Sequence, residues 1–174
     1  MKHFQFLLLD AGPIMKLFEL GIWDSFIKHC DVTISQTVAN EAKYASQEFL
    51  DILIDIELYK EKGFIKIVDL DPSIVKTFYN KFDLQYKAII HDGEKETLAF
   101  LCICSDDYRL CAADGAVFRV LGLLGKADKG ISLEEILTQI GMWKKLEWQY
   151  TKKFREKYTL LGQADSIQDK GLRG

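Results

Sequence analysis

The 174-residue sequence lacks any apolar run approaching the ~20 residues that a membrane-spanning helix needs. No basic segment followed by a long apolar segment precedes the first acidic residue, so the pattern of a secretory signal peptide is also missing. The four cysteines show neither Cys-x-x-Cys spacing nor a companion histidine pair. These absences predict a cytoplasmic protein without a membrane partner and disfavour structural zinc. They also predict reduced thiols, with Cys102, Cys104 and Cys111 buried and unreactive.

The net charge is small, but the charges are unevenly distributed along the chain. The net charge is −3, and it divides into −7 over residues 1–141 and +4 over residues 142–158. An acidic body binds nucleic acid poorly in general, although carboxylates that hold a divalent metal ion add acidity for a functional reason. The length and the 48% apolar content indicate one domain with a proper core, followed by a tail.

The sequence is organised around residues 4–10, FQFLLLD. Such a nearly unbroken apolar run is typical of a strand buried on both faces of a parallel sheet. Asp10 ends this strand, and Pro13 fits the first turn of the helix that follows. Because functional crevices lie at the carboxyl ends of parallel strands, Asp10 is a candidate site residue. The alternative is that Asp10 only caps the helix.

The same arrangement recurs near Asp114. An apolar strand is predicted over residues 108–113, and Asp114 and Gly115 separate it from an apolar helix. Two strands of one parallel sheet would then end in aspartate. Both carboxylates would emerge at the same edge of that sheet.

Glutamates on two predicted helices could reach this edge. Glu41 stands beside the apolar stripe of a helix that begins at Ser35 or Gln36, although an exposed helical glutamate is the alternative. Glu94 and Glu96 precede the nearly all-apolar helix 97–104, where acids also simply favour a helix start. They differ by about 200° around a helix and cannot face one site together. We favour Glu96.

The remaining pattern completes an α/β chain. We expect a three-layer α/β/α fold with a central parallel sheet of four to five strands and a C-terminal helical extension. Residues 1–140 would form this α/β domain, 141–161 a basic aromatic helix and 162–174 a disordered tail. Further strands are expected over 32–34 and 64–68, and a helix over 47–62.

The helix expected over residues 142–161 has two interpretations. Its aromatic residues recur at intervals of three or four and share a face, and lysines and arginine occupy much of the remainder. The aromatic face could pack on its own domain. Alternatively, the helix could dock a second copy of the chain or another protein, or its charges could guide RNA.

Four acids, Asp10, Glu41, Glu96 and Asp114, can thus be brought to one crevice. Grouped carboxylates repel, and the group persists only if cations or protons neutralise it. Oxygen-only ligation suits Mg²⁺ or Mn²⁺, and such ions support in-line displacement at a phosphodiester. Hydrolysis of nucleic acid is therefore the leading interpretation.

Four segments follow one another along the chain. They are LLLDAGP, SQTVANEA, GEKETLAFL and CAADGAVFRVLG. In this order they resemble the PIN domain family, small metal-dependent nucleases that include VapC-type toxins. The resemblance implies a PIN-like fold, an Mg²⁺- or Mn²⁺-dependent endoribonuclease, RNA as substrate, an antitoxin protein as partner and a homodimer. The family's metal-binding, catalytic acids fall on Asp10, Glu41, Glu96 and Asp114, and the Gly-Glu-x-Glu subgroup makes Glu94 the alternate.

Two competing functions follow. One is a catalytically weak or inactive PIN-fold module that binds RNA or protein. The other is a phosphoacceptor domain with one Mg²⁺ beside a modified aspartate, which needs paired acids before the phosphorylated strand and a lysine that ends a late strand. Neither feature is evident in the sequence.

Overall fold

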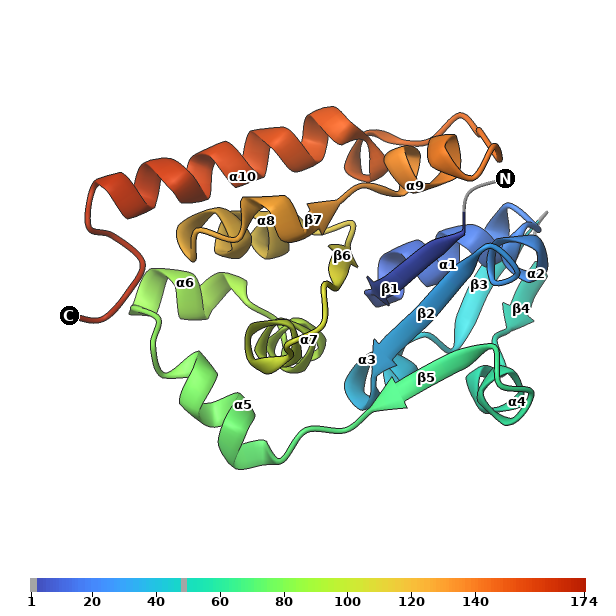
Figure 1. Cartoon of the computed structure of the whole chain (residues 1–174), viewed down its shortest axis with the longest axis horizontal. Coiled ribbons are helices and arrows are strands. Elements are labelled where there is room, and N and C mark those ends of the chain that lie inside the picture. The colour runs from blue at the N-terminus through green and yellow to red at the C-terminus, as the bar shows by residue number, and fades with distance from the viewer. Residues whose placement is uncertain (1–2, 48–49) are drawn as a thin grey trace.

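The centre of the protein is a sheet of five parallel strands in the order β5-β2-β1-β6-β7 (Figure 1). The computed structural model describes residues 3–47 and 50–174. The strands of the sheet are β1 (Phe4–Leu9), β2 (Cys30–Ser35), β5 (Ile65–Val68), β6 (Arg109–Cys111) and β7 (Gly130–Ile131). This confirms the predicted parallel sheet, with the strand that precedes Asp10 in its middle.

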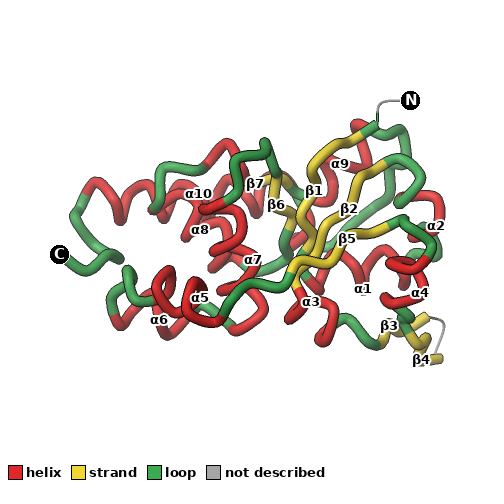
Figure 2. The backbone as a smooth tube through the Cα atoms, turned by 60° about the horizontal axis from the view of Figure 1, so that its bottom comes forward, coloured by secondary structure: helices red, strands yellow, loops and turns green. Residues whose placement is uncertain are grey.

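Helices cover both faces of the sheet, as the pleat of β1 requires. Leu7 and Leu9 belong to one apolar core and Leu8 to the other, because successive side chains of a strand point to opposite faces. The first core takes in α1 (Ala11–Glu19), α2 (Trp23–Phe26), α3 (Gln36–Glu41), α4 (Ile56–Glu61) and α9 (Leu133–Gln139). The second takes in α5 (Pro72–Tyr79), α6 (Leu84–Ile89), α7 (Asp92–Ile103), α8 (Gly115–Leu123) and part of α10 (Lys152–Ile167). Figure 2 draws the strands between α1 and α7, so the fold is the three-layer α/β/α arrangement that was expected. No helix within the described residues is long and apolar enough to cross a bilayer.

The prediction of one helix over residues 47–62 was wrong. An antiparallel hairpin of β3 (Tyr44–Gln47) and β4 (Leu50–Leu53) occupies its first part, and α4 begins only at Ile56. Residues 48–49 lie outside the described residues. Ile54 and Ile56 are buried whereas Leu53 and Asp55 are exposed. This period of two is that of extended chain, and Asp55 then caps α4 by accepting a hydrogen bond from the amide of Leu58.

The limits of the C-terminal helix also differ from those expected. The helix predicted over residues 142–161 begins at Lys152, because the Thr151 hydroxyl accepts a hydrogen bond from the Phe154 amide and caps it there. A short 3₁₀ turn, η2 (Trp148–Tyr150), precedes the cap. The helix then runs on to Ile167, into the segment that was expected to be disordered.

Backbone pairing fixes the last residues of the chain, which contradicts the expected disordered tail. The amide of Asp83 donates to the carbonyl oxygen of Gly171, and the Gly171 amide donates to the Asp83 carboxylate. Arg173 likewise donates its amide to the carbonyl of Lys81. These partners lie some ninety residues away along the chain, so the sequence near the terminus gives no sign of them.

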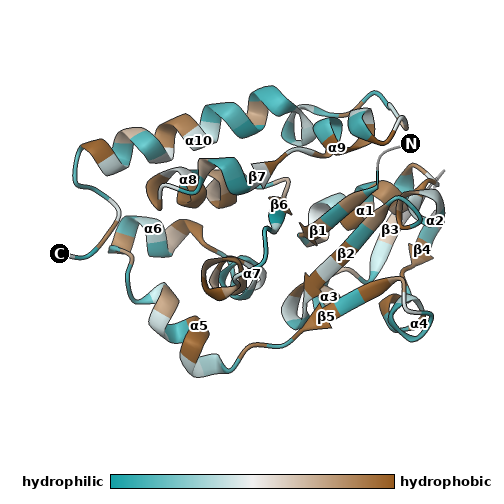
Figure 3. Cartoon of the chain, viewed as in Figure 1, coloured by the Kyte–Doolittle hydropathy of each residue, from teal (hydrophilic) through white to brown (hydrophobic). Residues whose placement is uncertain are grey.

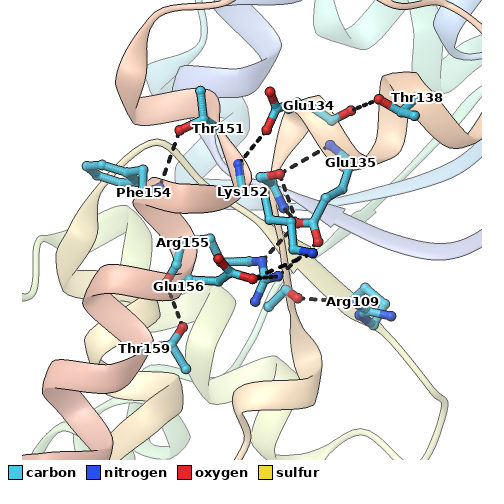
Figure 4. Close-up of polar contacts among 12 residues, drawn as sticks. Arg109, Glu134, Glu135, Thr138, Thr151, Lys152, Phe154, Arg155, Glu156 and Thr159 are labelled. Atoms are coloured by element: carbon cyan, nitrogen blue, oxygen red, sulfur yellow. Dashed lines mark hydrogen bonds and ion pairs between the residues drawn. The ribbon is translucent and has the colours of Figure 1, made fainter.

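α10 packs lengthwise on α8, which supports the packing interpretation of the aromatic residues. Phe154 is buried in the core beside Phe118. In Figure 3, α8 is mostly hydrophobic along its length whereas α10 alternates between hydrophilic and hydrophobic residues. Figure 4 shows how α10 is also tied to α9, where Arg155 donates two hydrogen bonds of 2.8 Å to the carboxylate of Glu135. Trp143, by contrast, stays 68% exposed.

The expectation for the cysteines held only in part. Cys30 and Cys111 are buried, and burial raises the pKa of the Cys30 thiol to about 12. Cys102 and Cys104 are partly exposed, contrary to the prediction. They flank the exposed Ile103 at the end of α7, where the helix reaches the surface.

Candidate functional site

Asp10 and Asp114 emerge at the same edge of the sheet. β1 and β6 are neighbours, with Leu9 opposite Cys111, and the Asp10 amide extends the pairing by donating to the Cys111 carbonyl at 3.0 Å. Asp10 follows its strand directly, and Asp114 comes three residues after Cys111. The parallel topology therefore places both aspartates at the carboxyl edge, where sites form in open α/β sheets.

The two aspartates differ in their capping roles. Asp114 caps α8, and its carboxylate accepts a hydrogen bond of 2.8 Å from the Ala116 amide. Asp10 occupies the N-cap position of α1 without a side-chain capping hydrogen bond. The geometry therefore does not support the alternative in which Asp10 serves only as a helix cap.

Glu41 reaches this region from the last turn of α3. Its side chain is exposed and lies directly over Gly93, at the start of α7. A Cβ atom on Gly93 would lie only 2.6 Å from Glu41 Oε2. Gly93 thus leaves the space that the Glu41 carboxylate fills, a role that sequence reasoning missed. The only signal for it is a glycine in the first turn of a helix, where it is otherwise unfavourable.

Glu94 is buried beside these three acids. Its carboxylate accepts a hydrogen bond of 2.9 Å from the His91 amide. Burial raises its pKa to about 8, and the charges of Asp114, Asp10 and Glu41 add to the rise. We call Asp10, Glu41, Glu94 and Asp114 the acid cluster.

The same repulsion acts on Asp10. Its pKa is raised to about 6, chiefly by burial and also by the charges of Glu41 and Asp114, while the hydrogen bond from the Ala11 amide opposes the rise. Since the charges of Glu41 and Asp114 act on both Asp10 and Glu94, the four carboxyl groups share one electrostatic environment.

Glu96, which the sequence favoured over Glu94, is committed elsewhere. Its Oε2 accepts hydrogen bonds from the amide of Thr37 at 2.9 Å and from the Thr37 hydroxyl at 2.6 Å. Its Oε1 accepts from the Leu70 amide at 3.0 Å. Thr37 lies in the first turn of α3, whose amides have no partner within the helix. Glu96 therefore joins α7 to α3 and to the segment after β5, and the structure groups Glu94 with the other acids.

No positive side chain neutralises the acid cluster directly. Among residues 3–47 and 50–174, no lysine, arginine or histidine forms an ion pair with any of its four members. His91 acts on Asp10 only as a weaker charge that lowers its pKa. Arg119, which lines the cavity beside Asp114, is paired with Asp165 at 2.6 Å.

The acid cluster borders an open cavity of about 360 Å³. Asp114 and His91 line it on one side, and Arg119 and Tyr158 on another. Tyr158 comes from α10 and presses on Gly115, where an added Cβ would lie 2.5 Å from the ring. α10 therefore forms one wall of the space beside Asp114, a contribution that the sequence did not predict.

The donor chemistry of the acid cluster suits a hard divalent cation, since all four side chains offer carboxylate oxygens. The arrangement is looser than a finished metal site, because no group of three or more His, Cys, Asp or Glu side chains in the described part of the chain is arranged to hold an ion. Like charges keep carboxylates apart, so their convergence requires neutralisation by protons or by cations. At neutral pH a proton on Glu94, whose pKa burial raises to about 8, supplies part of it. The residues match a hard cation by donor type, but within the described residues their side chains form no ion site in this arrangement.

Comparison with known proteins assigns no family to the chain. No family model matches it, and no curated protein matches it. The chemistry of the acid cluster is therefore the basis on which a function is proposed.

Proposed function

We propose that the protein is a cytoplasmic Mg²⁺- or Mn²⁺-dependent endoribonuclease that uses the acid cluster. The observation that carries the proposal is the grouping of Asp10, Glu41, Glu94 and Asp114 at the carboxyl edge of a parallel sheet, where none of the four forms an ion pair with a lysine or arginine of the described residues. Carboxylates grouped in this way repel one another, and a bound divalent cation reduces that repulsion. In a structural acid cluster, basic side chains would be expected to supply that neutralisation.

The four acids have distinct tasks in this proposal. Asp10 and Asp114 are fixed by strand ends and would form the rigid part of the ion site, while Glu94 would complete it from α7. Glu41 is exposed and would close over the ion from the solvent side. A bound Mg²⁺ supplies positive charge at the phosphate and lowers the pKa of a water molecule. Hydrolysis of RNA would break one P–O bond of the backbone, with the oxygen of a water molecule joining phosphorus and a proton going to the leaving oxygen.

The choice of RNA rests on the resemblance of four sequence segments to PIN domains. The same resemblance is the basis for proposing a toxin role with an antitoxin as partner, and a homodimer. Trp143 at 68% exposure and Trp148 at 51% are the large apolar side chains before α10 that such a protein partner could cover.

A second candidate is an inactive module of the same fold that binds RNA or protein. It is favoured by the loose arrangement of the acids, since no group of three in the described residues is placed to hold an ion. The two candidates differ in one respect that can be measured. Only the nuclease loses an activity when the acid cluster is altered or the metal is removed.

The variant Asp114→Asn tests the nuclease directly. Asparagine can still cap α8 by accepting the Ala116 hydrogen bond, so the fold should persist while one metal-binding charge is lost. We expect cleavage of a fluorescently labelled single-stranded RNA with Mn²⁺ to fall by more than about 100-fold, because even outer partners of metal sites cost 10- to 100-fold. Excess EDTA should abolish the wild-type activity.

The matched control is Asp128→Asn, which makes the same chemical change at a side chain that is 76% exposed and precedes β7, at the opposite edge of the sheet. It should cleave at the wild-type rate. Full activity of Asp114→Asn, or of the wild type in EDTA, would refute the proposed nuclease.

A further inference from the structure

A second cavity lies at the same edge of the sheet as the acid cluster. It has a volume of about 430 Å³ and opens where β2 and β5 end, between α3, α5 and α7. This size is within the range of small-ligand sites. Leu70, Pro72 and Val75 give it an apolar lining, and we call it the edge cavity.

Two helices connect the edge cavity to the acid cluster. α7 places Glu96 and Lys95 at the cavity and Glu94 in the cluster. α3 begins at the cavity with Thr37 and ends in the cluster with Glu41. In the sheet, β5 lies two strands from β1, a separation of about 10 Å. One extended polymer strand along this edge could therefore occupy both places.

The rim of the edge cavity carries lysines and acids beside its apolar lining, and one of the lysines is free to contact a phosphate. Lys76 is exposed and forms no ion pair within the described residues. Lys95 pairs with Asp92 at 2.7 Å and also lies 4.2 Å from the centre of the Tyr79 ring. Three acids line the cavity as well, namely Asp69, Asp92 and Glu96. Of the two lysines in its lining, Lys76 on α5 is the one without an ion pair among the described residues.

We propose that the edge cavity binds a nucleotide of the same single-stranded RNA whose backbone is cleaved at the acid cluster. The base rests on the apolar lining next to Tyr79, and Lys76 contacts a neighbouring phosphate. This inference rests on the proposed function, because it extends the substrate from the acid cluster to a second place. Base contacts of this kind tolerate any sequence, and the phosphate contact makes binding salt-dependent.

Binding is measured apart from cleavage by fluorescence anisotropy with a labelled single-stranded RNA in EDTA. Val75→Trp fills the edge cavity, and its control Ile74→Trp adds the same bulk to a neighbouring position of α5 that does not line it. We expect Val75→Trp to weaken binding by about 10-fold, the scale of one lost base contact. Ile74→Trp should leave the affinity unchanged.

Lys76→Met removes the charge and keeps most of the side-chain stem. We expect the slope of log affinity against log salt to become shallower by about 0.7, the value for one phosphate contact of a single strand. Lys28→Met is the control, because Lys28 is exposed just before β2, at the opposite edge of the sheet. For Lys28→Met, the slope of log affinity against log salt should equal that of the wild type.

The results separate this inference from the nuclease itself. Wild-type cleavage together with unchanged binding in Val75→Trp and Lys76→Met would overturn the edge cavity as a subsite and leave the nuclease standing. Weakened binding in both variants supports the subsite even if the wild type does not cleave RNA. Absence of any RNA binding by the wild type would overturn the inference.

Discussion

Gly162→Ala is expected to lower the free energy of unfolding by about 3 kcal/mol, the upper end of the usual range for overpacking. A Cβ atom at Gly162 would lie 1.9 Å from the carbonyl oxygen of Arg119 and 2.8 Å from the amide nitrogen of Leu123. Both are backbone atoms of α8, so no side chain can rotate away. Gly122 makes the reciprocal approach, where an added Cβ would lie 2.1 Å from the Thr159 carbonyl oxygen.

The sign of this effect is diagnostic. Within a helix, alanine is intrinsically more stable than glycine by about 1 kcal/mol, so helix propensity alone predicts a gain. Urea denaturation of Gly162→Ala can be compared with Ser166→Ala, an exposed position of the same helix that should change stability by a few tenths of a kcal/mol. A Gly162→Ala protein as stable as the wild type would contradict the close crossing of α8 and α10.

Glu94→Gln and Glu96→Gln are expected to have opposite consequences. Glu94→Gln keeps an acceptor for the His91 amide but removes a charge from the acid cluster, so we expect a folded protein whose cleavage of RNA drops by more than about 100-fold. Glu96→Gln leaves only one acceptor oxygen for the amides of Thr37 and Leu70. Losing such charge-assisted hydrogen bonds costs about 1.5–3 kcal/mol, while the metal site should keep its affinity.

The dependence on pH sharpens the comparison. A glutamate side chain ordinarily has a pKa of 4.5, and burial raises the pKa of Glu94 to about 8 in the folded protein. The folded state therefore holds a proton that the unfolded state releases, and the free energy of unfolding falls as the pH rises from about 4.5 to about 8. In metal-free buffer, the free energy of unfolding of Glu94→Gln should fall less over this pH range than that of the wild type. Urea midpoints of both variants across that range provide the test, and the prediction fails if Glu96→Gln, not Glu94→Gln, flattens the profile.

The sequence was sufficient to predict the sheet and the position of two acids. The strand over residues 4–10 was expected to be buried on both faces, but only residues 7–9 are buried, whereas Gln5 and Phe6 are exposed. Asp10 follows that buried apolar half, and Asp114 follows the apolar segment that contains β6. Parallel pairing then brings their positions to one edge without further information. These predictions depended on burial, and a run of apolar residues in the local sequence indicates burial directly.

The choice between Glu94 and Glu96 depended on contacts that the local sequence does not contain. The donors that occupy Glu96 come from Thr37 and Leu70, 59 and 26 residues away along the chain. The space for Glu41 is similarly provided by Gly93, on another helix. Hydrophobic periodicity indicates which face of a helix is buried, but it does not identify the residues that contact that face.

Some of the predicted element boundaries were wrong for a related reason. The apolar spacing over 47–62 matched a helix, but cross-strand pairing of β3 with β4 and a cap at Asp55 determined the structure. The C-terminal segment beyond Gly162 reads as polar, yet the Gly162 crossing and the pairing of Gly171 with Asp83 order it. Both cases show tertiary contacts overriding local pattern.

Calorimetric titration of the metal-free protein with Mn²⁺ tests most directly whether the acid cluster is a metal site. The account predicts saturable binding at pH 7, with a proton released to the buffer because Glu94, with a pKa of about 8, starts largely protonated. Repeating the titration in two buffers of different ionisation enthalpy measures that proton. Asp10→Asn should lose the binding. No uptake by the wild type, or equal uptake by Asp10→Asn, would contradict the account.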